Sequence, residues 1–314
     1  MDVLHVRPGH VSSTLEDLPL QDYDFAIVSV GPRNVTRLPE ALRDLTCPVF
    51  SLENDPGTVE VIRRRYGLTR VYFGVPDVIA SSAASPEHLA LDPFAVHTEN
   101  GVLYLEDPGT SVEPLKQLLP AVIWLPRQRL NEEWDAKLYL HNMPHCIAAY
   151  LGHLAGCRYL HESMAVPAAR RIVDGAIEEM LLALKLATKY DQRFMESYAD
   201  KEIRRFSNDL LCDPISRVAR EPLRKLQASG RLMGALRMML FTGVRPVNLM
   251  LGIAGALMYD ATIDEDGAKM KLLDEFGVTA FIQYHLGLGP DSLESKYITT
   301  HFDDARAHLM REFA

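Results

Sequence analysis

The hydrophobic pattern of the chain changes character near residue 130. Before that point, short β-rich runs alternate with helix-like stretches. The strands are expected at DFAIVSVG (24–31) and PVFSLEN (48–54), and the helices at LPEALRDL (38–45) and TVEVIRRRYG (58–67). Such alternation is typical of parallel βαβ units, whose ligands bind beyond the carboxyl ends of the strands.

Two further segments extend this pattern before it changes. VYFGVPDVIA (71–80) and FAVHTENGVLYLED (94–107) are predicted to be strands or a hairpin, with Glu99, Asn100 and Gly101 as turn residues. After residue 130, apolar residues recur at helical spacing, as in AARRIVDGAIEEMLLALKLATKY (168–190). The second half is therefore expected to be α-helical.

The length and charge limit the kinds of protein that this can be. With 314 residues, the chain is long enough for two domains, which we predict at residues 1–125 (α/β) and 126–314 (mostly α-helical). A net charge of -9 argues against duplex nucleic acid or an anionic membrane as the main partner. A small anionic ligand needs only a local basic pocket.

Cysteine usage and hydropathy indicate the compartment. The four cysteines lack the paired spacing of a disulfide framework or a zinc site. No leader-like segment and no apolar run long enough to cross a bilayer is visible in the sequence. We expect a cytoplasmic protein.

The stretch KLYLHNMPH (137–145) concentrates polar groups before an apolar helix. On one α-helix, Lys137, Asn142 and His145 would fall within an arc of about 140°. Pro144 would kink that helix. Alternatively, the helix breaks at Asn142, which would act as an N-cap. An ordinary interpretation also stands: a solvated lysine, a capping asparagine and a surface histidine.

The same stretch resembles the signature of the mannitol-1-phosphate 5-dehydrogenase branch of the polyol-specific long-chain dehydrogenases, the mannitol dehydrogenase family. That signature is Lys-x4-Asn-x2-His followed by a helix rich in Ala, Tyr and Gly. The similarity runs in order from about residue 22 to residue 260. Its other segments are DFAIVSVGP, SLENDPGT, VYFGVPD, SRVAREPLRKLQASGRL (216–232) and NLMLGIAGAL (248–257).

The resemblance implies roles for four residues. Lys137 would be the general base that takes the hydroxyl proton of a polyol as hydride leaves for NAD. Asn54 and Asn142 would donate hydrogen bonds to the developing alkoxide. His145 would hold a neighbouring hydroxyl. No metal is required in this scheme.

A basic segment is expected to hold the substrate. The family resemblance puts Arg224 and Lys225 at the substrate, and we include Arg220 with them. Arginine suits phosphate because its planar fork donates two parallel hydrogen bonds. A solvated basic helix face is the alternative for each of these residues.

The chain contains no G-x-G-x-x-G motif, which the family uses to hold the cofactor pyrophosphate. We therefore expect a truncated Rossmann-like sheet that lacks its first βαβ half. The nicotinamide end of NAD would then contact Val30 and Gly31. Losing early strands would leave a sheet edge open, which a second copy or a partner chain would cover.

Two functions follow from these expectations. One is an NAD-dependent oxidoreductase acting on a polyol or sugar phosphate of the mannitol 1-phosphate or fructose 6-phosphate type. The other is a catalytically inactive homologue that binds the sugar phosphate after losing its cofactor site. If the chain is a fragment of a longer protein, the first function holds in full.

Overall fold

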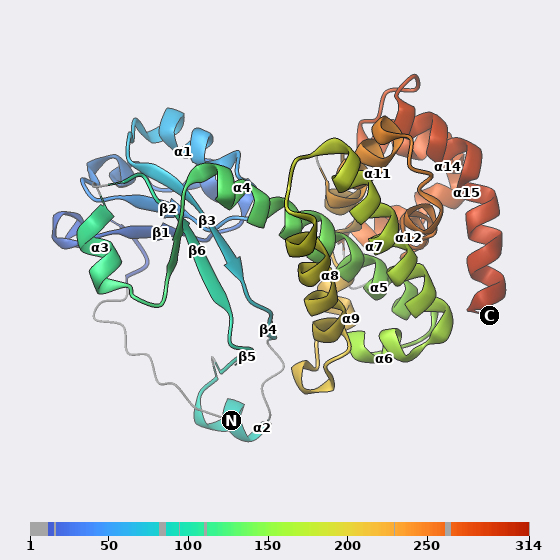
Figure 1. Cartoon of the computed structure of the whole chain (residues 1–314), viewed down its shortest axis with the longest axis horizontal. Coiled ribbons are helices and arrows are strands. Elements are labelled where there is room, and N and C mark those ends of the chain that lie inside the picture. The colour runs from blue at the N-terminus through green and yellow to red at the C-terminus, as the bar shows by residue number, and fades with distance from the viewer. Residues whose placement is uncertain are drawn as a thin grey trace. The chain divides into compact units, whose positions relative to one another are not determined.

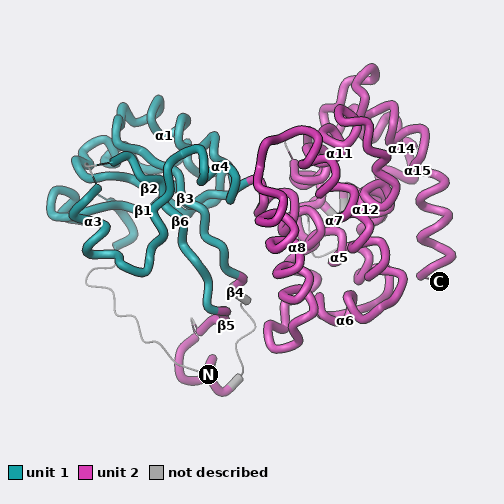
Figure 2. The backbone as a smooth tube through the Cα atoms, viewed as in Figure 1, with its two compact units in different colours: residues 1–78, 100–134 teal, residues 79–99, 135–314 magenta. Residues whose placement is uncertain are grey.

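In the computed structural model, which describes residues 12–15, 17–81, 86–93, 95–109, 112–228, 230–260 and 265–313, helices and strands follow the order drawn in Figure 1. Contacts divide the chain into two compact units (Figure 2). The first unit is Met1–Val78 with Asn100–Trp134, and the second is Ile79–Glu99 with Asp135–Ala314. The boundary expected between residues 125 and 126 lies just before the helix in which this division falls.

The first unit is built on a five-stranded sheet of order β1-β2-β3-β6-β7. Antiparallel pairing joins β3 to β6, while the other three pairs are parallel. The predicted α/β class is confirmed. The strands are β1 (Ala26–Val28), β2 (Val49–Ser51), β3 (Val71–Asp77), β6 (Val102–Glu106) and β7 (Ile123–Leu125).

Short helices connect these strands. The stretch predicted at 38–45 forms a 3-10 helix rather than an α-helix, whereas 58–67 forms α1, which Gly67 ends at a φ of 70°. The β2 residues are fully buried, with Phe50 packed in a cluster that includes Leu105 and Leu115. The helices are η1 (Leu20–Asp22), η2 (Pro32–Arg37), η3 (Glu40–Asp44), α1 (Thr58–Tyr66), α3 (Glu113–Leu118) and α4 (Arg127–Ala136).

The second unit begins with a segment that leaves the sheet after β3. It carries α2 (Pro86–Leu91) and the two-residue strands β4 (Ala80–Ser81) and β5 (His97–Thr98), which pair antiparallel. Helices make up the rest. They are η5 (Lys137–Asn142), α5 (Met143–Leu154), α6 (Leu160–Ala165), α7 (Pro167–Ala187), α8 (Gln192–Phe206), η6 (Asp209–Leu211), α9 (Ile215–Ala219), α10 (Pro222–Leu226), α11 (Arg231–Thr242), α12 (Val247–Leu257), α13 (Glu265–Met270), α14 (Leu272–Leu286) and α15 (Leu293–Glu312).

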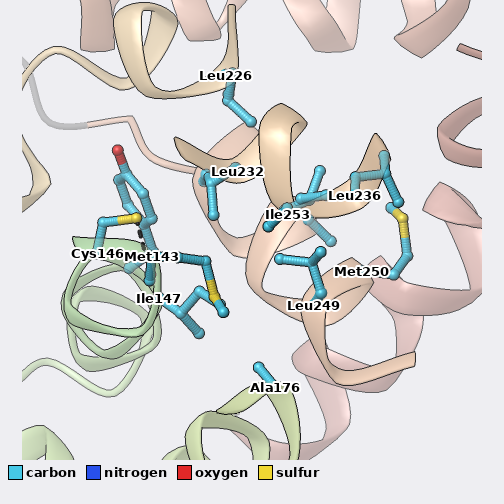
Figure 3. Close-up of a cluster of buried hydrophobic side chains, with 14 of the residues drawn as sticks. Met143, Cys146, Ile147, Ala176, Leu226, Leu232, Leu236, Leu249, Met250 and Ile253 are labelled. Atoms are coloured by element: carbon cyan, nitrogen blue, oxygen red, sulfur yellow. Dashed lines mark hydrogen bonds between the residues drawn. The ribbon is translucent and has the colours of Figure 1, made fainter. Parts of the chain in front are cut away.

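The helical core forms around α5, which is buried from Met143 to Gly152. Side chains from α5, α7, α11 and α12 meet there, among them Ile147, Ala176, Leu236 and Ile253 (Figure 3). The helix predicted at 168–190 is confirmed as α7, whose apolar face is buried. Among the described residues, no helix combines the length and apolarity needed to cross a membrane.

Candidate active site

The residues Lys137 to Asn142 form a π-helix, η5, between α4 and α5. Its hydrogen bonds join residues five apart, as from the amide of Met143 to the carbonyl of Leu138. Lys137 and Asn142 are also five apart and therefore lie one turn apart on the same face. A π-turn brings together two side chains that an α-helix would separate by about 140°.

Pro144 gives a physical reason for the π-turn. In an α-helix, a proline ring clashes with the carbonyl of residue i−4, here Leu140. The wider turn lies directly before Pro144, which occupies the first turn of α5. The alternative of a break at Asn142 is wrong, because Asn142 has helical angles (φ -63°, ψ -37°) and its side chain makes no cap hydrogen bond, although Pro144 does lie in the first turn as that alternative had it.

All three signature side chains are buried. Lys137, Asn142 and His145 are only 8%, 6% and 7% exposed. This excludes the interpretation of a solvated lysine and a surface histidine. The Nδ2 atom of Asn142 is buried and has no hydrogen-bond partner within the described part of the chain. A buried amide donor without a partner is costly, so a ligand atom there would be stabilised.

His145 is oriented by a buried carboxylate. Its Nε2 lies 3.0 Å from Oδ2 of Asp213, and Oδ1 of Asp213 accepts hydrogen bonds from Arg217 at 2.6 and 2.8 Å. Burial is the main cause that lowers the pKa of His145 to about 4, so the ring is neutral near pH 7. Because ionised Asp213 only accepts, Nε2 carries the proton and Nδ1 is the acceptor.

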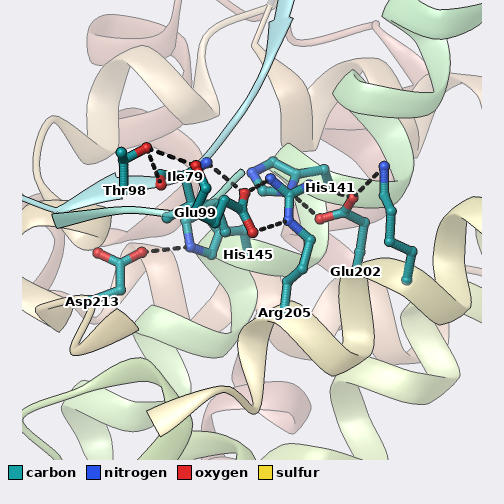
Figure 4. A network of polar contacts seen from close by, with 9 residues as sticks. Ile79, Thr98, Glu99, His141, His145, Glu202, Arg205 and Asp213 are labelled. Carbon is teal, nitrogen blue, oxygen red and sulfur yellow. Dashed lines mark hydrogen bonds and ion pairs between the residues drawn. The ribbon is translucent and has the colours of Figure 1, made fainter. Parts of the chain in front are cut away.

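The structure adds His141, a residue that sequence analysis missed. Its Nδ1 lies 2.5 Å from Oε2 of Glu202, which is fully buried (Figure 4). Burial alone would raise the pKa of Glu202, but His141 and Arg205 lower it to about 2. The only sequence signal was spacing, since His141 is four residues from both Lys137 and His145.

The predicted substrate residues lie on and before α10. Lys225 is buried, and burial lowers its pKa to about 7. Its Nζ donates a hydrogen bond to the backbone oxygen of Arg220, whose residue is exposed. Arg224 is half-buried and donates to Glu221 at 2.8 and 3.0 Å. Glu221 has a φ of 55°, a strained angle for a residue with a side chain.

Tyr150 lies beside Lys225. The Nζ of Lys225 is 5.8 Å from the centre of the Tyr150 ring. The Tyr150 hydroxyl is buried, and no described residue bonds to it. Burial keeps the pKa of Tyr150 well above its ordinary value, so the hydroxyl is a donor. Sequence analysis did not single out this tyrosine.

The remaining predicted residues belong to the first unit. Asn54 is exposed just after β2. Val30 and Gly31 follow β1, and their backbone amides donate to Oε1 of buried Glu53 at 2.6 and 3.0 Å. The Val30 side chain is 42% exposed. The described part of the chain contains no cluster of three or more His, Cys, Asp or Glu residues suited to a metal ion.

Comparison with known proteins finds a family match in the helical unit. Residues 133–286 match the family profile described as the mannitol dehydrogenase C-terminal domain. The resemblance to the mannitol dehydrogenase family expected from the sequence is confirmed over this part of the chain. The match contains the whole Lys137 to His145 signature and the basic segment around Arg224, and it ends with α14.

Curated relatives carry the name mannitol-1-phosphate 5-dehydrogenase. The protein from Caldanaerobacter subterraneus is 36% identical over 159 residues, which are 50% of this chain and 41% of that protein. The Exiguobacterium protein is 28% identical over 310 residues, covering 93% of this chain and 78% of that protein. The first alignment thus spans less than half of the relative's length.

Solved structures share the fold. The chain superimposes on Pseudomonas fluorescens mannitol 2-dehydrogenase, solved as a ternary complex with NAD and D-mannitol, with a TM-score of 0.68 at 17% identity. That superposition covers 92% of this chain and 72% of the other. A D-sorbitol dehydrogenase superimposes with a TM-score of 0.66 at 14% identity, covering 94% of this chain and 75% of that one. At these identities the likeness concerns the fold alone.

Proposed function

We propose that the chain is an oxidoreductase that transfers hydride between NAD and a polyol or sugar phosphate, with Lys137 as the general base. One observation carries the proposal: η5 aligns buried Lys137 with Asn142, whose amide donor lacks a partner in the described structure. The match to the mannitol dehydrogenase C-terminal domain and the names of the relatives support the reaction class.

The chemistry divides among the signature side chains. When NAD is bound, its nicotinamide supplies the hydride acceptor. The Nζ of Lys137 takes the proton of the hydroxyl being oxidised, and in reverse it protonates the ketone. The Nδ2 of Asn142 donates to the oxygen as negative charge develops there. Nδ1 of neutral His145 accepts a hydrogen bond from a neighbouring hydroxyl. The amide role of Asn54 stays a prediction.

Basic residues support a phosphorylated substrate of the mannitol 1-phosphate or fructose 6-phosphate type. Arg224 and Lys225 would pair with the phosphate, with Arg220 at the edge of the site. The Arg224 guanidinium donates to the Glu221 carboxylate. The donor hydroxyl of Tyr150 adds to this environment. A phosphate would thus balance buried positive charge.

The residues of the first unit fit the nicotinamide end of NAD. The turn after β1 exposes Val30, while Glu53 fixes the amides of Val30 and Gly31. This turn follows the carboxyl end of β1, which pairs parallel with β2, and α/β sheets bind ligands at the carboxyl ends of such strands. The second candidate is a non-catalytic sugar-phosphate-binding homologue, which would share the same buried side chains and basic residues. A second copy covering the sheet edge remains a proposal.

Calorimetric titration of the purified chain with NADH, with and without fructose 6-phosphate, tests the proposal. Micromolar NADH binding followed by turnover supports the dehydrogenase. Heat from fructose 6-phosphate without any from NADH, and with no turnover, supports the non-catalytic candidate instead. No heat from either ligand would contradict both.

A further inference from the structure

His141 and His145 form a packed pair in which each ring is held by its own carboxylate. The ring centres are 4.9 Å apart, and both rings pack on Phe206, at 5.5 and 5.1 Å. Asp213 holds one ring and Glu202 the other (Figure 4). An arginine in turn holds each carboxylate: Arg217 for Asp213 and Arg205 for Glu202.

The support of His141 extends to the segment after β3. Arg205 donates to Oε1 of Glu202 at 2.6 Å and from its Nε to Oε2 of Glu99 at 3.1 Å. Glu99 also accepts the backbone amide of Ile79 at 2.7 Å. Glu202 is fully buried, and Arg205 is only 10% exposed in its side chain. An ionic array this well buried and partnered fixes the geometry of the groups that it binds.

We propose that His141 is a positioning residue of this site, locked by Glu202 and Arg205 against His145 so that His145 presents its Nδ1 to a substrate hydroxyl in one orientation. The role rests on the function proposed above for His145. The proposal gives a role to a buried histidine that the signature Lys-x4-Asn-x2-His leaves unspecified. Arg205 and Glu99 would support that role, because Arg205 binds both Glu202 and Glu99.

The effect of His141 on the pKa of His145 can be measured. The charged and titratable groups that act on His145 are Asp213, His141 and Arg217. After burial, which is the main cause, His141 and Arg217 oppose a charge on His145 and lower its pKa, while Asp213 raises it. Removing His141 therefore raises the pKa of His145. A phenylalanine at position 141 would keep the ring that buries His145, so a raised pKa of His145 in His141→Phe reports the lost electrostatic effect of His141 and not the space that it fills.

Two substitutions separate the contributions of His141. His141→Gln can still hydrogen-bond to Glu202 but loses the ring contact with His145, whereas His141→Phe keeps the ring contact but loses the hydrogen bond. His153→Gln is the matched control, because His153 lies on α5, the helix that carries His145, and pairs with Asp260 at 3.1 Å outside the site. Thermal melting establishes that each variant is folded, so either His141 variant suffices if the other unfolds.

The primary readout is the titration of His145 by NMR with isotope-labelled histidine, without any ligand. We expect His145 to titrate near pH 4 in the wild type and His153→Gln, and at higher pH in both His141 variants. In turnover, kcat/KM should fall about tenfold in both variants, the scale for a group that orients a functional histidine. The acid limb of the pH profile of kcat/KM should also move to higher pH in both His141 variants.

An unchanged His145 titration in a folded His141 variant would overturn the proposal. So would an unchanged kcat/KM. Since the titration needs neither cofactor nor substrate, it distinguishes this proposal from the proposed function. A chain without turnover whose His145 titration still shifts would contradict the dehydrogenase while supporting the positioning of His145 by His141.

Discussion

The buried carboxylate of Asp213 accepts a hydrogen bond from Nε2 of His145 at 3.0 Å, and this contact decides which ring nitrogen carries the proton. Asp213→Asn keeps the shape of the side chain, but its amide can donate to Nε2 and favour the opposite tautomer. We expect kcat/KM to fall on the order of 10- to 100-fold. Steady-state kinetics measure kcat/KM of Asp213→Asn. Asp260→Asn is the control, because it alters the pair that Asp260 makes with His153 outside the site. Equal activity of both variants would refute the assigned tautomer.

The low pKa of His145 predicts loss of stability in acid. Unfolding returns the pKa from about 4 to 6.5, so the unfolded state binds more protons between these values. Stability is therefore complete above pH 6.5 and decreases as the pH falls toward 4, by up to about 3 kcal/mol from this group. Denaturant unfolding of His145→Gln should show a smaller acid loss than the wild type. His153→Gln should lose as much stability in acid as the wild type. If the free energy of unfolding of His145→Gln fell with pH as steeply as that of the wild type, this account would be contradicted.

The cations of α10 predict selectivity for phosphate. Arg224→Ala should weaken the binding of fructose 6-phosphate about 10- to 100-fold, which is the scale of hydrogen bonds to charged groups. The binding of unphosphorylated fructose should change little.

The pH dependence of phosphate binding depends on Lys225. Its side chain is charged below its pKa of about 7, so the affinity for phosphate should decrease as the pH rises through that value. Titration calorimetry at several pH values measures both effects. Arg170→Ala is the control, because Arg170 pairs with Asp174 on α7. Equal losses for both sugars would remove Arg224 from the phosphate role.

Two glycines of α12 predict opposite responses to the same substitution. A Cβ on Gly252 would lie 2.5 Å from Cγ1 of Ile147, whereas one on Gly255 would meet its nearest atom at 3.5 Å. Gly252→Ala should lower the free energy of unfolding by about 1–3 kcal/mol, because the added methyl group overpacks the contact with Ile147. Gly255→Ala should be neutral or stabilise by up to about 1 kcal/mol, the helix propensity difference. Denaturant unfolding measures both; equal effects would mean that α5 and α12 do not approach closely at Gly252.

Much of the fold follows from local sequence patterns. The period of apolar residues predicted α1 and α7 to within a few residues, and β-rich runs predicted β1, β2 and β3. Contacts between residues far apart in the sequence could not be predicted from local patterns. The segment Ile79–Glu99 follows a sheet strand, yet its contacts are with the helical unit, and Glu99 binds Arg205 at a separation of 106 residues.

The candidate site was predicted only in part for a similar reason. Residue types and family resemblance pointed to Lys137, Asn142 and His145. The π-turn that aligns the first two was not predicted, because it depends on one extra residue per turn, and Pro144 alone hinted at a distortion. His141, Glu202 and Asp213 were missed, since their importance arises from contacts 61 and 68 residues apart in sequence.

The central claim is that Lys137 moves the proton, and Lys137→Ala tests it most directly. The measurement pairs NADH-dependent reduction of fructose 6-phosphate with calorimetric binding of the same sugar phosphate. Lys185→Ala on the exposed side of α7 is the control. The account predicts that Lys137→Ala abolishes turnover while sugar-phosphate binding stays nearly intact and Lys185→Ala behaves as the wild type. Turnover at the wild-type rate in Lys137→Ala would contradict it.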